Sequence, residues 1–299
     1  MNAIEIHNLS KSYGKLQALS NVSLEVRQGE LFGLIGPDGA GKTTLFRLLT
    51  TLLKPTTGNA KVEGLDIVKD YRAIRARVGY MPGRFSLYPD LTVEENLNFF
   101  AALFGVKVSD SYDLVAPIYK QIEPFKKRRA GKLSGGMKQK LALSCALIHR
   151  PKVLFLDEPT TGVDAVSRSE FWDMLAELKG KGITIMASTP YMDEASRCDR
   201  IALCNEGRIL GIDTPDGIVS RFDALLYAVS AKDMFALLQE VRKCEGVEVC
   251  YPFGEVHHIV ANENFDEEEI RNKLSHIEGL EIYSISPTIE DVFIKLMKQ

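Results

Sequence analysis

Residues 31–44 read LFGLIGPDGAGKTT, and this stretch decides the fold. A short apolar run ends in a glycine-rich turn, and the segment that follows, KTTLFRLLTTLL, carries Leu45, Leu48, Leu49 and Leu52 at helical spacing. GPDGAGKT matches the pattern G-x-x-x-x-G-K-[ST] in the strand–turn–helix context that the pattern requires. The sequence therefore predicts a buried parallel strand that leads into a phosphate-binding loop at the start of a helix.

The residue types in this loop suit a nucleoside triphosphate. Glycines let the backbone wrap closely around phosphate, and successive N–H groups at a helix start form an anion-binding concavity. The Lys42 ammonium reaches the β- and γ-phosphates, and the Thr43 hydroxyl is placed to bind Mg²⁺. We therefore predict ATP and Mg²⁺ as ligands. The predicted ATP-binding residues of the loop are Gly36, Asp38, Gly39, Ala40, Gly41, Lys42, Thr43 and Thr44.

A second apolar run, KVLFLDE at residues 152–158, ends in two carboxylates. Asp157, at the carboxyl end of a buried strand, is predicted to hold Mg²⁺ directly or through water. Glu158 is predicted to polarise the attacking water as general base. A lone Asp-Glu pair after a strand is more often the start of a loop. The phosphate loop upstream is what favours the catalytic interpretation.

The string LSGGMKQK at residues 133–140 predicts a second anion-binding helix start in the same chain. Ser134, Gly135 and Gly136 would expose a hydroxyl and N–H groups to an anion. One chain has no obvious need for two such ends, but a head-to-tail dimer does. Each ATP is then held between one subunit's phosphate loop and the other subunit's serine-glycine turn.

Strands alternate with helices along the first two thirds of the chain. ITIMAS at residues 183–188 is a further predicted strand, and helices are predicted in LTVEENLNFFAALF (91–104, with a capping box) and SRSEFWDMLAELKG (167–180). This order indicates an α/β fold built on a largely parallel sheet. The predicted domains are residues 1–218, with a helical subdomain at about 88–150, and residues 219–299.

The pattern after residue 218 is β-α-β-β-α-β followed by a last helix, with a hairpin turn near residues 252–255. That order suits a small α+β module of the ferredoxin-like type.

Bulk composition narrows the class of protein. The chain has 299 residues and a formal net charge of -3, which gives no electrostatic reason to expect nucleic acid as a partner. The short basic cluster KKRR at residues 126–129 is interpreted as a solvated helix end or loop. No run of 18 apolar residues occurs, and the five scattered cysteines form no metal-binding or disulfide pattern.

These motifs together resemble the ATP-binding subunits of ABC transporters. GPDGAGKTT, LSGGMKQK, VLFLDEPTTGVD and STPYMDEASRCDR occur in the family's order, and the resemblance covers about residues 1–215. The string SPTIEDVFIKLM at residues 286–297 is similar, more weakly, to the tail of ATPase subunits from ABC-2 type, drug-exporter-like systems. The resemblance implies a P-loop NTPase fold of the ABC ATPase type with an inserted helical subdomain.

The resemblance also implies roles and partners. Tyr13 would stack on adenine, with an ordinary strand-edge tyrosine as the alternative, and Ser134, Gly135 and Gly136 would contact the ATP held mainly by a partner. Asp164 would lie at the dimer seam. Residues 84–91 would face a membrane-spanning subunit, with Phe85, Leu87 and Tyr88 as contacts or simply as packing residues. The implied location is the cytoplasm, peripheral on the cytoplasmic face of the cell membrane.

Two positions do not fit the family pattern, and a third, Asp38, departs from it more mildly. The family has glutamine, a contact to Mg²⁺ and the attacking water, where this chain has Gly83. It has a histidine that bonds the γ-phosphate where this chain has Pro190, for which Ser188, Thr189 or Tyr191 would compensate only in part. Asp38 stands where asparagine is usual.

We therefore expect weak hydrolysis in the chain's own site and a different, complete ATPase subunit as partner. A homodimer that tolerates both changes stays open. Two other functions stay open as well: a catalytically near-inert regulatory ATP-binding half, and a soluble ABC-type ATPase that acts outside transport.

Overall fold

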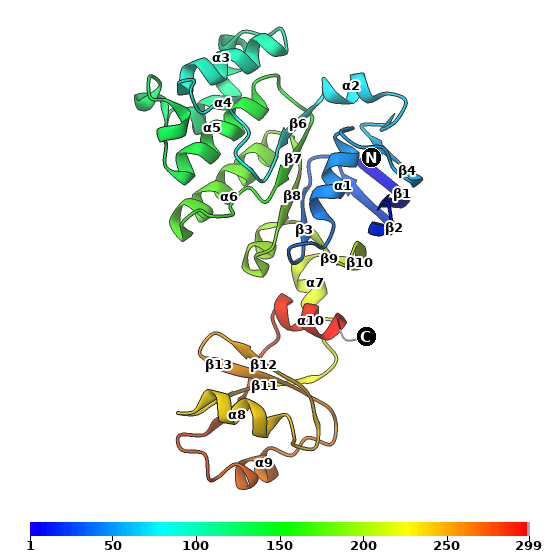
Figure 1. Cartoon of the computed structure of the whole chain (residues 1–299), viewed down its shortest axis with the longest axis vertical. Coiled ribbons are helices and arrows are strands. Elements are labelled where there is room, and N and C mark those ends of the chain that lie inside the picture. The colour runs from blue at the N-terminus through cyan, green and yellow to red at the C-terminus, as the bar shows by residue number, and fades with distance from the viewer. Residues whose placement is uncertain (298–299) are drawn as a thin grey trace. The chain divides into compact units, whose positions relative to one another are not determined.

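The computed structural model describes residues 1–297 and divides the chain into two compact units, Met1–Pro215 and a second that begins at Asp216 (Figure 1). Each unit has an apolar core of its own. No helix within residues 1–297 is both long enough and apolar enough to cross a bilayer.

The first unit is built around a six-stranded sheet, in which the phosphate loop follows one strand and the Asp157–Glu158 pair lies at the end of another. Its order is β10(Arg208–Asp213), β9(Arg200–Asn205), β3(Leu31–Ile35), β8(Thr184–Thr189), β7(Val153–Asp157), β6(Val78–Met81). All neighbours are parallel except β9 and β10. Every residue of β3, β7 and β8 is buried, as expected for strands with both faces covered.

A second sheet in this unit is antiparallel and is formed by strands near the N-terminus. Its order is β2(Leu16–Arg27), β1(Asn2–Tyr13), β4(Thr57–Val62), β5(Leu65–Asp66). Helix α1(Lys42–Leu49) shares one apolar core with both sheets, in which Ile4 of β1, Phe46 of α1 and Phe155 of β7 are buried. The phosphate loop is thus held between two sheets by apolar packing on both sides.

Helices occupy the chain between β6 and β7. They are α3(Val93–Leu103), α4(Tyr112–Tyr119) and α5(Gly135–Leu147), with short 3-10 turns between them, and they gather beside the large sheet in Figure 1. The predicted capping box is present, because Thr92 accepts from the Glu95 N–H and Glu95 accepts from the Thr92 N–H. Outside this segment lie α2(Tyr71–Arg75), α6(Ala165–Gly180) and α7(Pro215–Val219).

The helix after the phosphate loop is shorter than the leucine spacing predicted. Helix α1 ends at Leu49, and Leu52 is 54% exposed instead of lying on the buried face. Thr51 takes a positive φ of 64°, so the chain turns away from the helix there. The Leu52 N–H then closes back onto the Arg47 carbonyl at 2.8 Å.

The second unit has the predicted element order. Strands β11(Leu225–Ser230), β12(Val247–Phe253), β13(Val256–Ala261) and β14(Glu281–Ser284) form an antiparallel sheet in the order β12-β13-β11-β14. Helices α8(Met234–Val241) and α9(Glu267–Lys273) pack one apolar cluster, which includes Leu237 and Ile270. The last helix, α10(Ile289–Leu296), joins a second cluster with residues of β11 to β13.

Candidate nucleotide-binding site

The phosphate loop connects the end of β3 to the first turn of α1, as the sequence predicted. Gly41 precedes the helix with φ 97°, and a Cβ at that position would lie 2.6 Å from the Ala18 carbonyl oxygen. Only glycine accommodates both the left-handed backbone and this close approach. The loop is therefore held in one conformation where α1 begins. Backbone N–H groups at the start of this helix are available to bind an anion.

Lys42 is almost fully buried, and its ammonium lies at the centre of the site. Nζ donates to the Gly36 carbonyl at 2.7 Å and to the Pro37 carbonyl at 2.9 Å. It also forms an ion pair with Glu158 Oε1 at 3.1 Å. The ammonium is thus held by three oxygens that belong to the loop and to the strand β7 end.

Asp157 ends β7 directly beside the start of α1. Its Oδ1 accepts from the Thr43 hydroxyl at 3.1 Å and from the Ser188 hydroxyl at 3.0 Å. Burial raises the pKa of this carboxyl above its ordinary value, against the lowering effect of those two hydrogen bonds. A cation beside it would relieve the cost of the buried charge.

The Thr43 hydroxyl and the Asp157 carboxylate fit the preference of Mg²⁺ for a few hard oxygen ligands, with water and phosphate supplying the rest. Thr43 Oγ1 and Asp157 Oδ1 are 3.1 Å apart; Thr43 follows Lys42 in α1, and Asp157 is the last residue of β7, directly before Glu158. Within residues 1–297 no group of three or more His, Cys, Asp and Glu side chains could hold a metal by itself.

Glu158 takes a left-handed backbone conformation, with φ 50°. Its N–H donates to the Ser188 side-chain oxygen at 3.0 Å and to the Ser188 carbonyl at 3.1 Å. Strand β8 therefore fixes the turn at which β7 ends. A non-glycine residue held at positive φ costs free energy, and such strain concentrates at functional sites.

These elements border a cavity of about 440 Å³. Of the predicted residues, Tyr13, Gly39 to Thr44 and Glu158 line it, whereas Gly36, Asp38 and the predicted Mg²⁺ ligand Asp157 do not. Tyr13 is 43% exposed, and Lys11 Nζ lies 5.4 Å from its ring centroid. The sequence reasoning missed the lining residues Leu16, Gln17, Ala18 and Glu206, which no motif marks.

The serine-glycine turn does not line this cavity. Ser134 caps α5, accepting from the Met137 N–H at 3.4 Å, and is exposed together with Gly135. Gly136 faces the start of α6, because a Cβ there would lie 3.0 Å from Ser167 Oγ. Asp164 caps α6 through the Ser167 N–H at 3.0 Å. The turn and the start of α6 thus form an exposed surface separate from the chain's own phosphate loop.

The two positions that depart from the family pattern flank the carboxylate strand. A Cβ at Gly83 would lie 2.9 Å from the Asp157 carbonyl oxygen and 3.7 Å from Glu158 Cβ. Pro190 follows the end of β8 directly. Gly83 therefore has a packing reason that the sequence did not reveal: the chain passes too close to Asp157 for any side chain in this conformation.

The residues considered as substitutes for the missing histidine are engaged elsewhere. The Ser188 hydroxyl donates to Asp157. The Thr189 hydroxyl donates to buried Glu194 at 2.5 Å and accepts from the Tyr191 N–H at 3.0 Å. The Tyr191 ring lies under the Arg168 guanidinium, 4.1 Å from its centroid.

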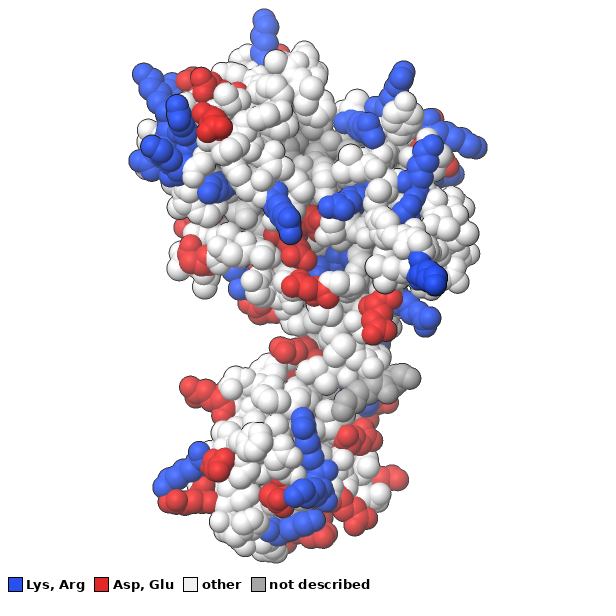
Figure 2. Space-filling view, in the orientation of Figure 1, with Lys and Arg blue, Asp and Glu red and all other residues white. Residues whose placement is uncertain are grey.

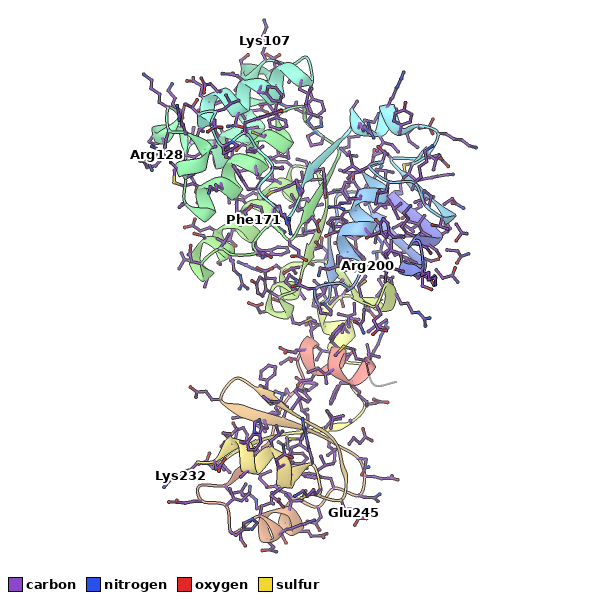
Figure 3. The ribbon with its side chains drawn as sticks, viewed as in Figure 1. Lys107, Arg128, Phe171, Arg200, Lys232 and Glu245 are labelled. Carbon is purple, nitrogen blue, oxygen red and sulfur yellow. The ribbon has the colours of Figure 1, made fainter. Side chains whose placement is uncertain are left out.

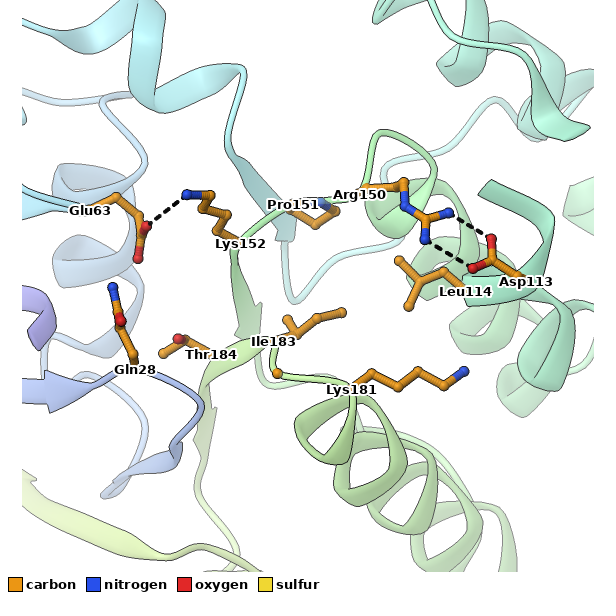
Figure 4. Close-up of a pocket in the computed structure, with 11 residues that line it drawn as sticks. Gln28, Glu63, Asp113, Leu114, Arg150, Pro151, Lys152, Lys181, Ile183 and Thr184 are labelled. Carbon is orange, nitrogen blue, oxygen red and sulfur yellow. Dashed lines mark hydrogen bonds and ion pairs between the residues drawn. The ribbon is translucent and has the colours of Figure 1, made fainter. Parts of the chain in front are cut away.

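A second, slightly larger cavity of about 520 Å³ lies at the opposite, amino edge of the sheet (Figure 4). It is bordered by two ion pairs, Lys152 with Glu63 at 3.8 Å and Arg150 with Asp113 at 2.6 Å. Its larger volume does not make it the better candidate site. It lies at the wrong edge, because ligands of open α/β sheets bind outside the carboxyl ends of the strands. The smaller cavity has that position and the convergent polar groups.

Comparison with known proteins agrees with this geometry. The family model described as ABC transporter matches residues 19–161. The probable multidrug ABC transporter ATP-binding protein YbhF of Escherichia coli (strain K12) is 39% identical over 303 residues, covering 98% of this chain but only 52% of that protein. This chain thus spans about half the length of that relative. The Nod factor export ATP-binding protein I of Paraburkholderia xenovorans (strain LB400) is 35% identical, covering 98% of this chain and 96% of that protein.

Solved structures match nearly three quarters of the chain. CbiO1 from Clostridium perfringens, part of the ABC transporter complex cbiONQ, is 27% identical with a TM-score of 0.66, covering 74% of this chain and 91% of that one. A dimeric ATP-binding cassette in a post-hydrolysis state, bound to ADP and Pi, is 26% identical with a TM-score of 0.64, covering 71% and 98%. The chain belongs to the family of ABC transporter ATP-binding proteins, the ABC ATPases.

Proposed function

We propose that the protein binds MgATP and hydrolyses it as the energy-coupling subunit of a membrane exporter. The observation that carries the proposal is the convergence of four side chains at one sheet edge: Lys42, Thr43, Asp157 and Glu158. Export is supported by the names of the relatives, two of which are a probable multidrug transporter protein and a Nod factor export protein.

The chain's residues divide the chemistry among them. The N–H groups of residues 39–44 and the Lys42 ammonium bind the phosphates. Thr43 and Asp157 would hold Mg²⁺, which neutralises phosphate charge when it is bound. Glu158 would take a proton from the attacking water once phosphate has replaced it as the partner of Lys42. Tyr13, exposed at the rim of the cavity, would stack on the adenine.

We expect this hydrolysis to be slow in the chain's own site. Gly83 offers no side chain to Mg²⁺ or water, and Pro190 offers neither a side-chain donor nor an N–H. The loss of one positioned transition-state group typically costs about 10²–10³-fold in rate. The Ser188 and Thr189 hydroxyls already donate to carboxylates, so neither is free to replace the missing donor, and the Tyr191 ring packs against the Arg168 guanidinium.

A heteromeric partner follows from the contrast between the two ends. The chain's own site lacks two groups, while the serine-glycine turn that would serve another subunit is complete and exposed. A complete ATPase subunit would gain a full composite site from this pairing. A homodimer is the alternative. Identification of the partner subunit would distinguish the heteromeric pair from the homodimer.

An apolar groove supports docking to a membrane-spanning subunit. Its volume is about 620 Å³, and its lining includes Pro82, Ser86 and Leu87 from the segment after β6 and Phe100, Leu103 and Phe104 from α3 and its end. Phe85 and Tyr88, beside it, are exposed by 38% and 47%. Such a docked subunit would hold the protein peripherally on the cytoplasmic face of the membrane.

Two other functions remain as alternatives. A near-inert regulatory half is favoured by Gly83 and Pro190 alone, whereas a soluble ABC ATPase outside transport has no feature that favours it. The strand order of the second unit, β12-β13-β11-β14, suits a ferredoxin-like assignment. This unit would regulate closure of the dimer or contact the partner subunit.

Steady-state ATPase assays of the purified chain test the proposal. We expect slow, Mg²⁺-dependent turnover that Glu158→Gln abolishes, with ATP binding retained by both proteins. Fast turnover in the isolated chain would contradict the weak-site proposal. Absence of ATP binding would contradict the function as a whole.

A further inference from the structure

Positive charge is concentrated in one exposed segment that the nucleotide site does not use. Residues 120–132 contain six basic side chains and one acidic one, Glu123, in a chain whose net charge is -3. The basic residues are Lys120, Lys126, Lys127, Arg128, Arg129 and Lys132, all but Lys126 exposed. Figure 2 shows the resulting cluster of Lys and Arg over the helical part of the first unit, where Arg128 is labelled in Figure 3.

Neighbouring acids neutralise only part of this charge. Glu94 forms an ion pair with Lys126 at 3.8 Å, and Glu95 is engaged in the capping box with Thr92. Within residues 1–297, Lys127, Arg128, Arg129 and Lys132 form no ion pair with any carboxylate. Hydrogen bonds from Thr92 and, to a smaller extent, the charge of Arg129 lower the pKa of Glu95, so Arg129 is partly compensated, whereas Lys127, Arg128 and Lys132 are exposed to solvent.

The basic segment is fixed to the stretch that precedes α3. The Gly131 N–H donates to the Pro89 carbonyl at 2.8 Å, the Ala130 N–H to the Leu91 carbonyl at 2.8 Å, and the Val93 N–H to the Arg128 carbonyl at 3.0 Å. Because the backbone is held, the side chains of residues 127–129 stand out from an ordered support and not from a free loop.

One exposed ring, Phe125, belongs to the basic segment, and two others, Tyr88 and Phe99, lie in α3 and the stretch before it, to which the segment is bonded. Tyr88 and Phe99 pack edge to face with centroids 4.8 Å apart, yet are 47% and 39% exposed. Phe125 is 36% exposed, with the Arg128 guanidinium 4.5 Å from its ring centroid, and Lys138 Nζ lies 5.5 Å from the Phe85 centroid. Rings and flexible cations on one surface are the combination that the water–lipid interface attracts.

We propose that this basic surface, residues 120–132 with its exposed Phe125 ring, binds anionic lipid headgroups. This proposal depends on the proposed function in one respect: a membrane-spanning subunit would bring the basic surface near a bilayer. Six basic side chains in this segment are within the range typical of clusters that recognise anionic lipid. A nucleic acid fits less well, because one 13-residue segment in a chain of net charge -3 is too short to follow a phosphate backbone.

Co-sedimentation of the purified full chain with lipid vesicles tests the proposal without ATP or any membrane subunit. The probes are vesicles of phosphatidylcholine alone and of phosphatidylcholine with phosphatidylglycerol. We expect binding only to the anionic vesicles, and loss of binding at about 1 M salt, where charges are screened beyond about 3 Å. The triple variant Lys127→Gln, Arg128→Gln, Arg129→Gln should bind about 100-fold more weakly.

The matched control is Lys61→Gln, Lys69→Gln, Arg72→Gln, which makes the same charge change at exposed positions elsewhere in the unit. It should bind like the unchanged chain, and both triples should keep its melting temperature. Equal binding by the two triples, binding to neutral vesicles, or no binding to anionic vesicles at low salt would each overturn the proposal. If the first triple instead loses only capture of a membrane subunit, the surface contacts protein and not lipid. Failure of ATP binding or hydrolysis would leave the vesicle result unaffected, so the two proposals fail separately.

Discussion

Ser188 is the residue that joins the two carboxylates of the site. It is fully buried, its hydroxyl donates to Asp157, and the same oxygen accepts the Glu158 N–H. Strand β8 therefore sets both the orientation of the predicted Mg²⁺ ligand and the strained turn at the predicted base. The sequence predicts Ser188 in this strand, but it suggests for this residue only partial replacement of the histidine that the family uses to bond the γ-phosphate.

Ser188→Ala should lower kcat by about 10-fold or more and weaken Mg²⁺ dependence, because both carboxylate positions lose a fixed partner. The unsatisfied groups should also cost about 1–3 kcal/mol of unfolding free energy. Steady-state kinetics against Mg²⁺ concentration measure the first effect and urea unfolding the second.

Ser144→Ala is the control, since Ser144 is equally buried and bonds the Lys140 carbonyl within α5. It should lose stability without a change in Mg²⁺ dependence. If the two variants behave alike in the kinetic assay, Ser188 has no positioning role.

Gly83 illustrates a constraint that only the structure reveals. A Cβ at this position would lie 2.9 Å from the Asp157 carbonyl oxygen, a backbone atom that cannot rotate away. Gly83→Ala should therefore cost about 1–3 kcal/mol of unfolding free energy and disturb the site. Thermal unfolding and ATP titration measure this.

Gly180→Ala is a suitable control, because a Cβ there meets no atom within 4 Å and φ is not positive. It should be neutral or slightly stabilising. The same crowding means that Gly83→Gln restores the family side chain only if the segment after β6 moves. A Gly83→Gln variant as stable as the unchanged chain would show that it does.

At the scale of elements, helix α10 is tied to its sheet by a buried carboxylate. Asp291 is fully buried, accepts from Thr288 in a capping box, and bonds Tyr251 and His258. Burial alone would raise the pKa of Asp291, but these hydrogen bonds outweigh it and hold the pKa below the ordinary 3.8. Its contribution to stability is therefore present above pH 3.8 and lost as pH falls through the lower folded value.

Asp291→Asn should speed amide hydrogen exchange in α10, β12 and β13 while β3 and β7 stay protected. It should also remove the part of the acid sensitivity that Asp291 contributes. Asp266→Asn, at the exposed cap of α9, is the control and should affect α9 alone. Uniform change across both units would contradict a local role for Asp291.

The elements that the sequence predicted well are those whose signal is local. Strands β3, β7 and β8 are continuous apolar runs, and the α3 cap is a four-residue pattern. What it missed depends on distant contacts: Leu52 is exposed because Thr51 turns the chain, and Glu206 enters the cavity from the β9–β10 turn. The domain boundary after residue 218 and the roles of the site residues stay predictions.

At the scale of the whole molecule, the phosphate loop and the serine-glycine turn lie apart on one chain, and we propose that they are the two halves of a composite nucleotide site. Lys42 and Glu158 lie at one, while Ser134 and Gly135 are exposed at another and do not line the same cavity. On this proposal a single chain cannot complete the site by itself, so turnover above the slow rate of the isolated chain depends on what supplies the other half. The predicted answer is a different ATPase subunit.

Mixing two damaged variants distinguishes a homodimer from pairing with a different ATPase subunit. Lys42→Ala removes the phosphate-binding ammonium and Gly135→Asp places a negative charge at the serine-glycine turn. In a homodimer, a mixed pair regains one site made of two undamaged halves, so mixing should restore part of the lost turnover. We expect no such recovery, because the working partner is another protein. Light scattering of Glu158→Gln with MgATP should accordingly report one chain, with the unliganded protein as control. ATP-dependent doubling of the mass together with recovery on mixing would establish the homodimer instead.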